Sequence, residues 1–100
     1  MLVSFRPEAQ ADALEAQAWY EQRSPGLGFE FARALETAVD SAARSPESFK
    51  AVPFNCRRVL LRRFPYVLIY RAVEEHLLVI AVFHHRRAPQ AWQARTQKTP

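Results

Sequence analysis

Side chains that can transfer protons and bind phosphate stand together in the stretch AVFHHRRAPQAW, residues 81–92. An apolar run ends at His84 and His85, and Arg86 and Arg87 follow directly. Free histidine has a pKa of about 6.5, so an imidazole can act as acid or base at cellular pH. Neighbouring arginines can bind a phosphate or stabilise the charge that develops during phosphodiester cleavage. The stretch is therefore a candidate active site and equally a candidate contact surface.

Strand geometry separates the two histidines. Side chains alternate across a strand, so His84 and His85 should point to opposite faces of a strand that carries both. A metal site needs three or four converging ligands. The nitrogen and sulfur donors are His76, His84, His85 and Cys56, and their spacing matches no familiar metal motif. We therefore expect no metal ion, no cofactor, and only one of the two histidines in any one pocket.

The composition predicts one folded domain, residues 1–100, with 49% hydrophobic residues and a single cysteine, Cys56. One cysteine cannot form an internal disulfide, which favours a cytoplasmic protein. No apolar run approaches the roughly 20 residues that cross a bilayer. The opening MLVSFRPEA lacks the layout of a signal peptide. We therefore expect neither a membrane protein nor a secreted one.

Positive charge is concentrated in the second half of the chain. Residues 1–50 carry five basic and eight acidic side chains, whereas residues 51–100 carry nine basic and two acidic ones. This asymmetry predicts a basic face for an acidic partner, either nucleic acid or protein. Four of the cations alternate around the apolar centre of RRVLLRRF, so they cannot all line one groove. They are Arg57, Arg58, Arg62 and Arg63.

Two helices are expected in the first half, after a short strand at residues 2–5. Pro7 suits the first turn of a helix that runs to about Arg23, and SPGLG at 24–28 interrupts the pattern. A second apolar stripe runs from Phe31 to the stop at Ser45–Pro46. The apolar face of the first helix is built of small residues and one tyrosine, namely Ala9, Ala13, Ala16 and Tyr20. We expect a helical hairpin, with Trp19 as a packing residue.

Three strands are expected in the second half, at residues 57–64, 66–73 and 76–83, after a loop at 46–56. Their short connections predict an antiparallel meander. The third run is apolar at both parities, which is typical of a strand with both faces covered. Simple alternation places Leu77, Val79, Ala81 and Phe83 on one face and Leu78, Ile80 and Val82 on the other. Tyr66 and Tyr70 should share a face, in the core or at its rim.

The predicted fold is therefore α+β, in the order β-α-α-β-β-β, with the hairpin packed on an antiparallel sheet. The second face of the sheet needs a cover. Either a short C-terminal helix within residues 88–97 or a partner chain could supply it.

This order of elements, with several landmark segments, resembles the RelE/ParE superfamily, the toxins of type II toxin–antitoxin pairs. Within the superfamily, the sequence is most similar to the ParE-like, plasmid-stabilisation branch. The segments are FRPEAQADALEAQAWYEQR, SPGLGFEF, SPESF, RRVLLRRFPYVLIYR and AVFHHRRAPQAWQAR. The resemblance implies a small cytoplasmic toxin in a hetero-oligomer with an antitoxin, whose disordered arm wraps the toxin.

The resemblance leaves two mechanisms open. RelE-type members cleave mRNA in the ribosomal A site, and ParE-type members inhibit DNA gyrase without a known catalytic residue set. A ribonuclease would use Arg58, Arg87 and one of His84 or His85. Two further cation positions of the RelE pattern hold Leu60 and Val67 here, and its tail tyrosine is missing, because nearby Trp92 has no hydroxyl. We therefore favour gyrase inhibition, with a non-toxic relative as a third alternative.

The remaining candidate residues are assigned to contacts with the target or the antitoxin. They are Arg57, Arg62, Arg63, Arg86, Trp92 and Arg95.

Overall fold

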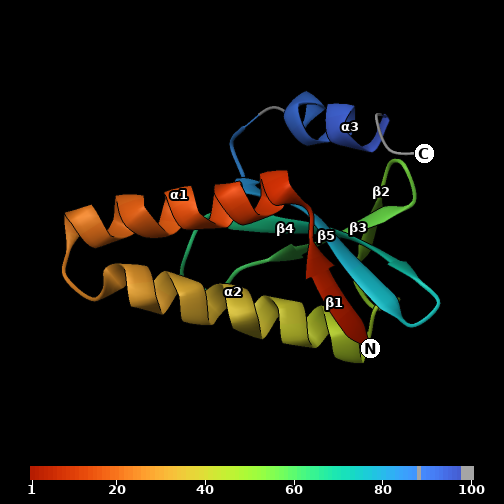
Figure 1. Cartoon of the computed structure of the whole chain (residues 1–100), viewed down its shortest axis with the longest axis horizontal. Helices are drawn as coiled ribbons and strands as arrows, with labels where there is room; N and C mark the ends of the chain where they lie inside the picture. The colour runs from red at the N-terminus through yellow and green to blue at the C-terminus, as the bar shows by residue number, and fades with distance from the viewer. Residues whose placement is uncertain (88, 98–100) are drawn as a thin grey trace.

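The computed structural model describes residues 1–87 and 89–97, which form three helices and five strands (Figure 1). The elements follow the order β-α-α-β-β-β-β-α, which confirms the α+β class and the helical hairpin. The first four are β1 (Leu2–Phe5), α1 (Pro7–Arg23), α2 (Leu27–Arg44) and β2 (Lys50–Val52). The last four are β3 (Cys56–Leu60), β4 (Tyr66–Val73), β5 (His76–His84) and α3 (Gln90–Gln97).

The hairpin of α1 and α2 closes tightly around two glycines. The Glu21 carboxylate accepts hydrogen bonds from the backbone N–H groups of Gly26, at 3.0 Å, and Gly28, at 2.9 Å. These bonds satisfy N–H groups at the start of α2 that have no partner within the helix. A Cβ at Gly28 would lie 2.7 Å from the backbone oxygen of Gln17. The two helices therefore approach each other at a point where only glycine fits.

The sheet has the strand order β1-β5-β4-β3-β2. The predicted meander of β3, β4 and β5 is antiparallel, as expected, but β1 pairs with β5 in parallel. The sheet is therefore mixed and not wholly antiparallel, because the helical hairpin between β1 and the rest permits a parallel crossover. The expected loop at 46–56 also contains β2, which pairs with β3 through a turn where Phe54 and Asn55 have positive φ.

Strand β3 is shorter than the predicted run at 57–64. It ends at Leu60, and residues 61–65 form a turn in which Arg63 has φ +69°. Pro65 cannot donate a hydrogen bond to a strand ladder, which favours this turn. Arg57 and Arg58 consequently lie on the strand, whereas Arg62 and Arg63 lie on the turn.

A bulge in β5 corrects the predicted alternation. Ile69 pairs with Ala81 but Tyr70 pairs with Val79, so Ile80 is an extra residue in β5. An extra residue reverses the parity of every side chain that follows it. Val82 therefore packs on the helix side with Leu77 and Val79, while Ile80 and Ala81 pack on the other side.

Both faces of the sheet are covered within the described residues. The helical hairpin packs on one face, where Tyr70 is fully buried and Tyr66 joins the same cluster, as predicted. Helix α3 packs on the other face through Trp92, which is only 4% exposed. The C-terminal helix is thus the cover that the apolar character of β5 requires; Ala88, in the segment predicted as helix, lies outside the described residues.

Candidate functional site

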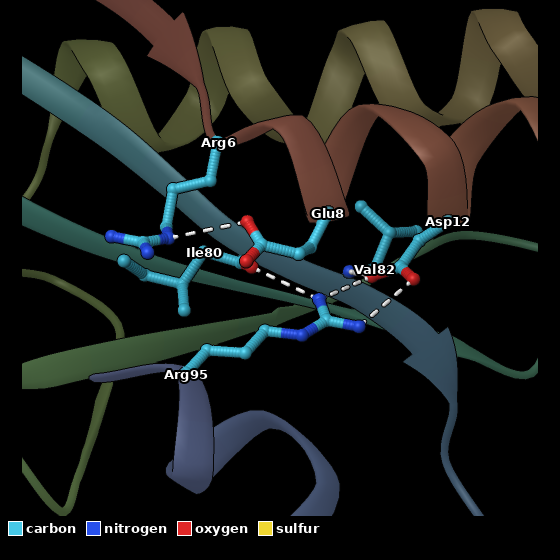
Figure 2. A network of polar contacts seen from close by, with 6 residues as sticks. All are labelled: Arg6, Glu8, Asp12, Ile80, Val82 and Arg95. Atoms are coloured by element: carbon cyan, nitrogen blue, oxygen red, sulfur yellow. Dashed lines mark hydrogen bonds and ion pairs between the residues drawn. The ribbon is translucent and has the colours of Figure 1, made fainter. Parts of the chain in front are cut away.

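An ion pair between α1 and α3 fixes the last part of β5, which ends at His84 and leads directly to His85. Arg95 donates to the Asp12 carboxylate at 2.7 and 3.1 Å (Figure 2), and hydrogen bonding to Asp12 raises the pKa of Arg95. Strand β1 pairs with β5 only as far as Val79. Beyond that point Asp12 accepts the N–H of Val82 at 3.1 Å, and Arg95 donates to the carbonyl of Ile80 at 3.2 Å. The Asp12–Arg95 pair thus forms hydrogen bonds with backbone groups of β5 at an edge that β1 does not reach.

The rings of His84 and His85 stack on each other, with centroids 5.0 Å apart and planes inclined by 18°. The expectation that they diverge is wrong for the rings, because β5 ends at His84 and His85 already belongs to a turn. The two residues nevertheless line different cavities. Nδ1 of His84 lies 3.1 Å from the backbone N–H of Arg86 and accepts its hydrogen bond. A neutral His84 therefore carries its proton on Nε2.

Three predicted catalytic residues meet in a cavity of about 270 Å³ beneath α3. Arg58, His85 and Arg87 line it, and the Trp92 ring forms part of its wall. Such a group can bind a phosphate and supply one imidazole for proton transfer. His84 is not part of this cavity. Trp92 belongs to the buried packing here, so a direct target contact by this residue would require α3 to move.

A second cavity, of about 440 Å³, lies between α1 and the end of β5 and was not predicted from the sequence. His84 and Arg87 reach it from the β5 end, and Glu15, Trp19 and Tyr66 complete its polar and aromatic wall. Trp19 is 48% exposed, so the prediction that it is a packing residue is wrong. Trp19 lies beside the stripe of alanines on α1 and not within it, and this position in the sequence could have indicated that its side chain is exposed.

Tyr66 occupies the wall of this second cavity between opposite charges. Burial raises the pKa of its hydroxyl; nearby Tyr20 and Glu15 act in the same direction, and Arg87 opposes them. The His84 ring contacts the Tyr66 ring edge to face, with centroids 5.6 Å apart. The charged groups of α1 and of the 84–87 segment therefore converge on one hydroxyl.

A third cavity, of about 510 Å³, is a groove between α2 and β3. Phe29 and Leu60 line it and are 62% and 60% exposed, respectively. Arg62 and Arg63 form its basic rim, and Arg63 also pairs with Glu30 at 2.8 Å. The groove thus combines exposed apolar side chains with positive charge.

The remaining candidates are dispersed. The Arg57 guanidinium donates to the carbonyl of Phe49 at 2.7 Å and so fastens the loop before β2. Arg86 is exposed at the turn after β5. Leu60 is exposed toward the groove and Val67 is buried, so the two positions without cations face different surroundings.

Among residues 1–87 and 89–97, no three His, Cys, Asp or Glu side chains come together in a way that could hold a metal ion. None of the helices in the same ranges combines the length and the apolar character needed to cross a bilayer.

Solved structures share this fold. A chain from the chromosomal ParDE TA system of P. aeruginosa is 16% identical with a TM-score of 0.72, over 84% of this chain and 95% of that one. The intact E. coli RelBE toxin–antitoxin complex gives 20% identity and a TM-score of 0.56, over 86% and 98%. The isolated E. coli RelE toxin gives 18% and 0.55, over 98% of both chains. At these identities the likeness shows the fold.

No curated protein matches the chain in sequence. A family does: residues 3–89 match the family described as "ParE toxin of type II toxin-antitoxin system, parDE". Because this match covers most of the chain, the protein belongs to the ParE toxin family of type II toxin–antitoxin systems.

Proposed function

We propose that this toxin acts by binding DNA gyrase in the cytoplasm and that a cognate antitoxin holds it inactive. The observation that carries the choice of target is the pair Leu60 and Val67, which stand where an mRNA-cleaving relative would carry cations. Cleavage needs cations around the phosphate as its charge develops. An apolar, exposed Leu60 serves a binding surface better than a catalytic one.

The groove between α2 and β3 is the proposed seat of the antitoxin arm. Phe29 and Leu60 offer apolar anchors, and Arg62 and Arg63 favour an acidic, amphipathic segment. β2 pairs with β3 no further than Arg58, so the outer edge of β3 beyond that residue can pair with an added strand. An arm that is disordered when free would gain both types of contact as it folds on the toxin.

Replacement of Leu60 by aspartate tests this seat. Leu60→Asp should weaken capture of the antitoxin encoded beside the toxin, by about tenfold or more, because a hot-spot side chain is worth roughly 2 kcal/mol. Leu14→Asp is the matched control, since Leu14 is also 60% exposed but lies on α1, away from the groove. Equal antitoxin affinity for the two variants would place the arm elsewhere.

Purified toxin added to gyrase and relaxed plasmid tests the target. The proposal expects loss of supercoiling, with cleaved plasmid trapped on the enzyme. Unchanged supercoiling without trapped plasmid would exclude gyrase as the target.

Ribosome-dependent mRNA cleavage is the second candidate, and the meeting of Arg58, His85 and Arg87 in one cavity favours it. Mapping of mRNA ends after brief induction separates the two. A-site cuts that disappear in the combined Arg58→Ala and His85→Ala variant would support a ribonuclease. Normal growth on induction, with neither cuts nor gyrase inhibition, would indicate the non-toxic relative.

A further inference from the structure

The cavity between α1 and the end of β5 has hydrogen-bonding capacity that the fold does not use. Within the described residues, the Glu15 carboxylate, the Arg87 guanidinium and Nε2 of His84 form no hydrogen bond or ion pair, although all three line this cavity of about 440 Å³. Among the residues that line the cavity, Asp12 instead stabilises the fold, because it accepts hydrogen bonds from Arg95 and from the backbone N–H of Val82. The unused groups are therefore available to a ligand.

These groups come in a specific combination. Glu15 accepts hydrogen bonds, whereas Arg87 and the Nε2–H of neutral His84 donate them. The wall between them is aromatic and includes half-buried Tyr66 and exposed Trp19. The Arg23 guanidinium lies over the Trp19 ring, 4.1 Å from its centroid, and so holds the indole in place while 48% of the residue stays exposed. An exposed, oriented indole is a stacking surface.

We propose that this cavity binds one unpaired nucleotide of a single-stranded nucleic acid. The base stacks on Trp19 and lies beside Tyr66, its exocyclic amino group donates to Glu15, and the adjoining phosphate lies against Arg87 and His84. Aromatic stacking with a cationic rim is how proteins hold single strands, and a cavity of this size is typical of small-ligand sites.

Two further arginines lie next to Arg87 and extend the basic surface beyond the cavity. Arg86 is exposed next to Arg87, and Arg58 shares with Arg87 the cavity beneath α3. A strand that places one base in the aromatic cavity can therefore continue along these cations with its next phosphates. An acidic peptide would meet the same cations, but it would face repulsion from Glu15 and would leave Trp19 without a stacking partner.

Base preference follows from Glu15. A carboxylate accepts from the amino groups of adenine, cytosine or guanine, whereas thymine and uracil have no such donor on their exocyclic positions. The site should therefore bind oligo-dA more tightly than oligo-dT. A base within a duplex cannot enter the cavity without being unpaired, so duplex DNA of equal length should bind more weakly.

Fluorescence anisotropy of labelled oligo-dA, oligo-dT and duplex, about eight nucleotides long, tests the proposal on the full chain. Trp19→Ala and Arg87→Ala should each raise the Kd for oligo-dA by about 5-fold or more. Glu15 is exposed, so Glu15→Gln should leave the fold intact. It should reduce the difference in Kd between oligo-dA and oligo-dT. Arg44→Ala removes an equal charge at the far end of α2 and should change the Kd by less than about twofold.

The proposal is overturned if no single strand binds saturably, or if duplex binds as tightly as oligo-dA. It is also overturned if Arg44→Ala weakens binding as much as Arg87→Ala while Trp19→Ala has no effect, because that pattern is non-specific charge attraction. The assay contains neither gyrase nor ribosome, so its failure would leave the proposed target untouched, and failure on gyrase would leave this site untouched.

Discussion

Asp12 on α1 and Arg95 on α3 lie 83 residues apart in the sequence and are joined by hydrogen bonds of 2.7 and 3.1 Å. They meet where β1 ends and leaves the edge of β5 open, and together they engage Val82 and Ile80 of that edge. One pair therefore holds three elements in register (Figure 2). The 84–87 segment, which contributes to two of the cavities, follows directly after this anchored part of β5.

Loss of Arg95 should destabilise the fold. In Arg95→Ala, Asp12 loses its charged partner and Ile80 loses a donor, so the free energy of unfolding should fall by about 1.5–3 kcal/mol. Asp12→Asn keeps an acceptor for the Val82 N–H and should cost less. Urea unfolding measures both changes, with exposed Arg44→Ala as the control. A loss for Arg95→Ala no larger than for the control would mean that the pair does not anchor α3.

The two glycines of the helical hairpin should respond differently to alanine. Gly28→Ala places a Cβ 2.7 Å from the Gln17 carbonyl oxygen, and overpacking of this kind costs about 1–3 kcal/mol. Gly26 has φ +90° but open space around its Cβ position, so Gly26→Ala adds only backbone strain, about 1 kcal/mol. Thermal unfolding of the two variants compares these costs. A larger loss for Gly26→Ala would show that the helix approach at Gly28 is not tight.

Tyr70 should make the fold sensitive to high pH. Burial raises the pKa of Tyr70 above its usual value of 10.0, and burial likewise raises the pKa of Tyr20 and Tyr66. Since the folded state favours the protonated hydroxyl, its stabilisation is complete below about pH 10 and is lost as the pH rises through the folded-state pKa. Urea midpoints at about pH 8 and pH 11 should therefore differ, with the lower midpoint at pH 11.

Tyr70→Phe provides the control for this pH dependence. The variant removes the hydrogen bond that Tyr70 donates to the Pro46 carbonyl, which should cost about 1–2 kcal/mol at neutral pH. It should also reduce the difference between the two midpoints, because one titrating group is gone. If the difference between the two urea midpoints is unchanged in Tyr70→Phe, the loss of stability at high pH is due to other groups.

Local sequence patterns predicted the elements of this fold better than their pairing. The apolar stripes of α1 and α2 and the short links between β3, β4 and β5 are local signals, and they predicted the helical hairpin and the meander. They did not predict β2, or the end of β3 at Leu60. The parallel pairing of β1 and the bulge at Ile80 depend on contacts between distant segments, which periodicity does not contain. The bulge alone moved Val82 to the helix side.

The candidate site was predicted in part for the same reason. The resemblance to ribonuclease members grouped Arg58 and Arg87 with one of the two histidines, and the structure brings Arg58, His85 and Arg87 together in one cavity. Glu15 and Trp19 stand on α1, far from the 84–87 segment in the sequence, so only the packing of α1 against β5 joins them to His84. The stacking of the two imidazoles depends on the end of β5 at His84, a boundary that the apolar pattern placed one residue too early.

The gyrase cleavage assay distinguishes a toxin that binds gyrase from one that cleaves mRNA. Purified toxin is added to gyrase, ATP and plasmid, and linear DNA is measured after denaturation of the enzyme. Linear DNA should rise with toxin concentration and persist in the combined Arg58→Ala and His85→Ala variant, because binding needs no catalytic residues. No linear DNA with the wild-type toxin, together with A-site mRNA cuts that this variant abolishes, would contradict the proposed binding to gyrase.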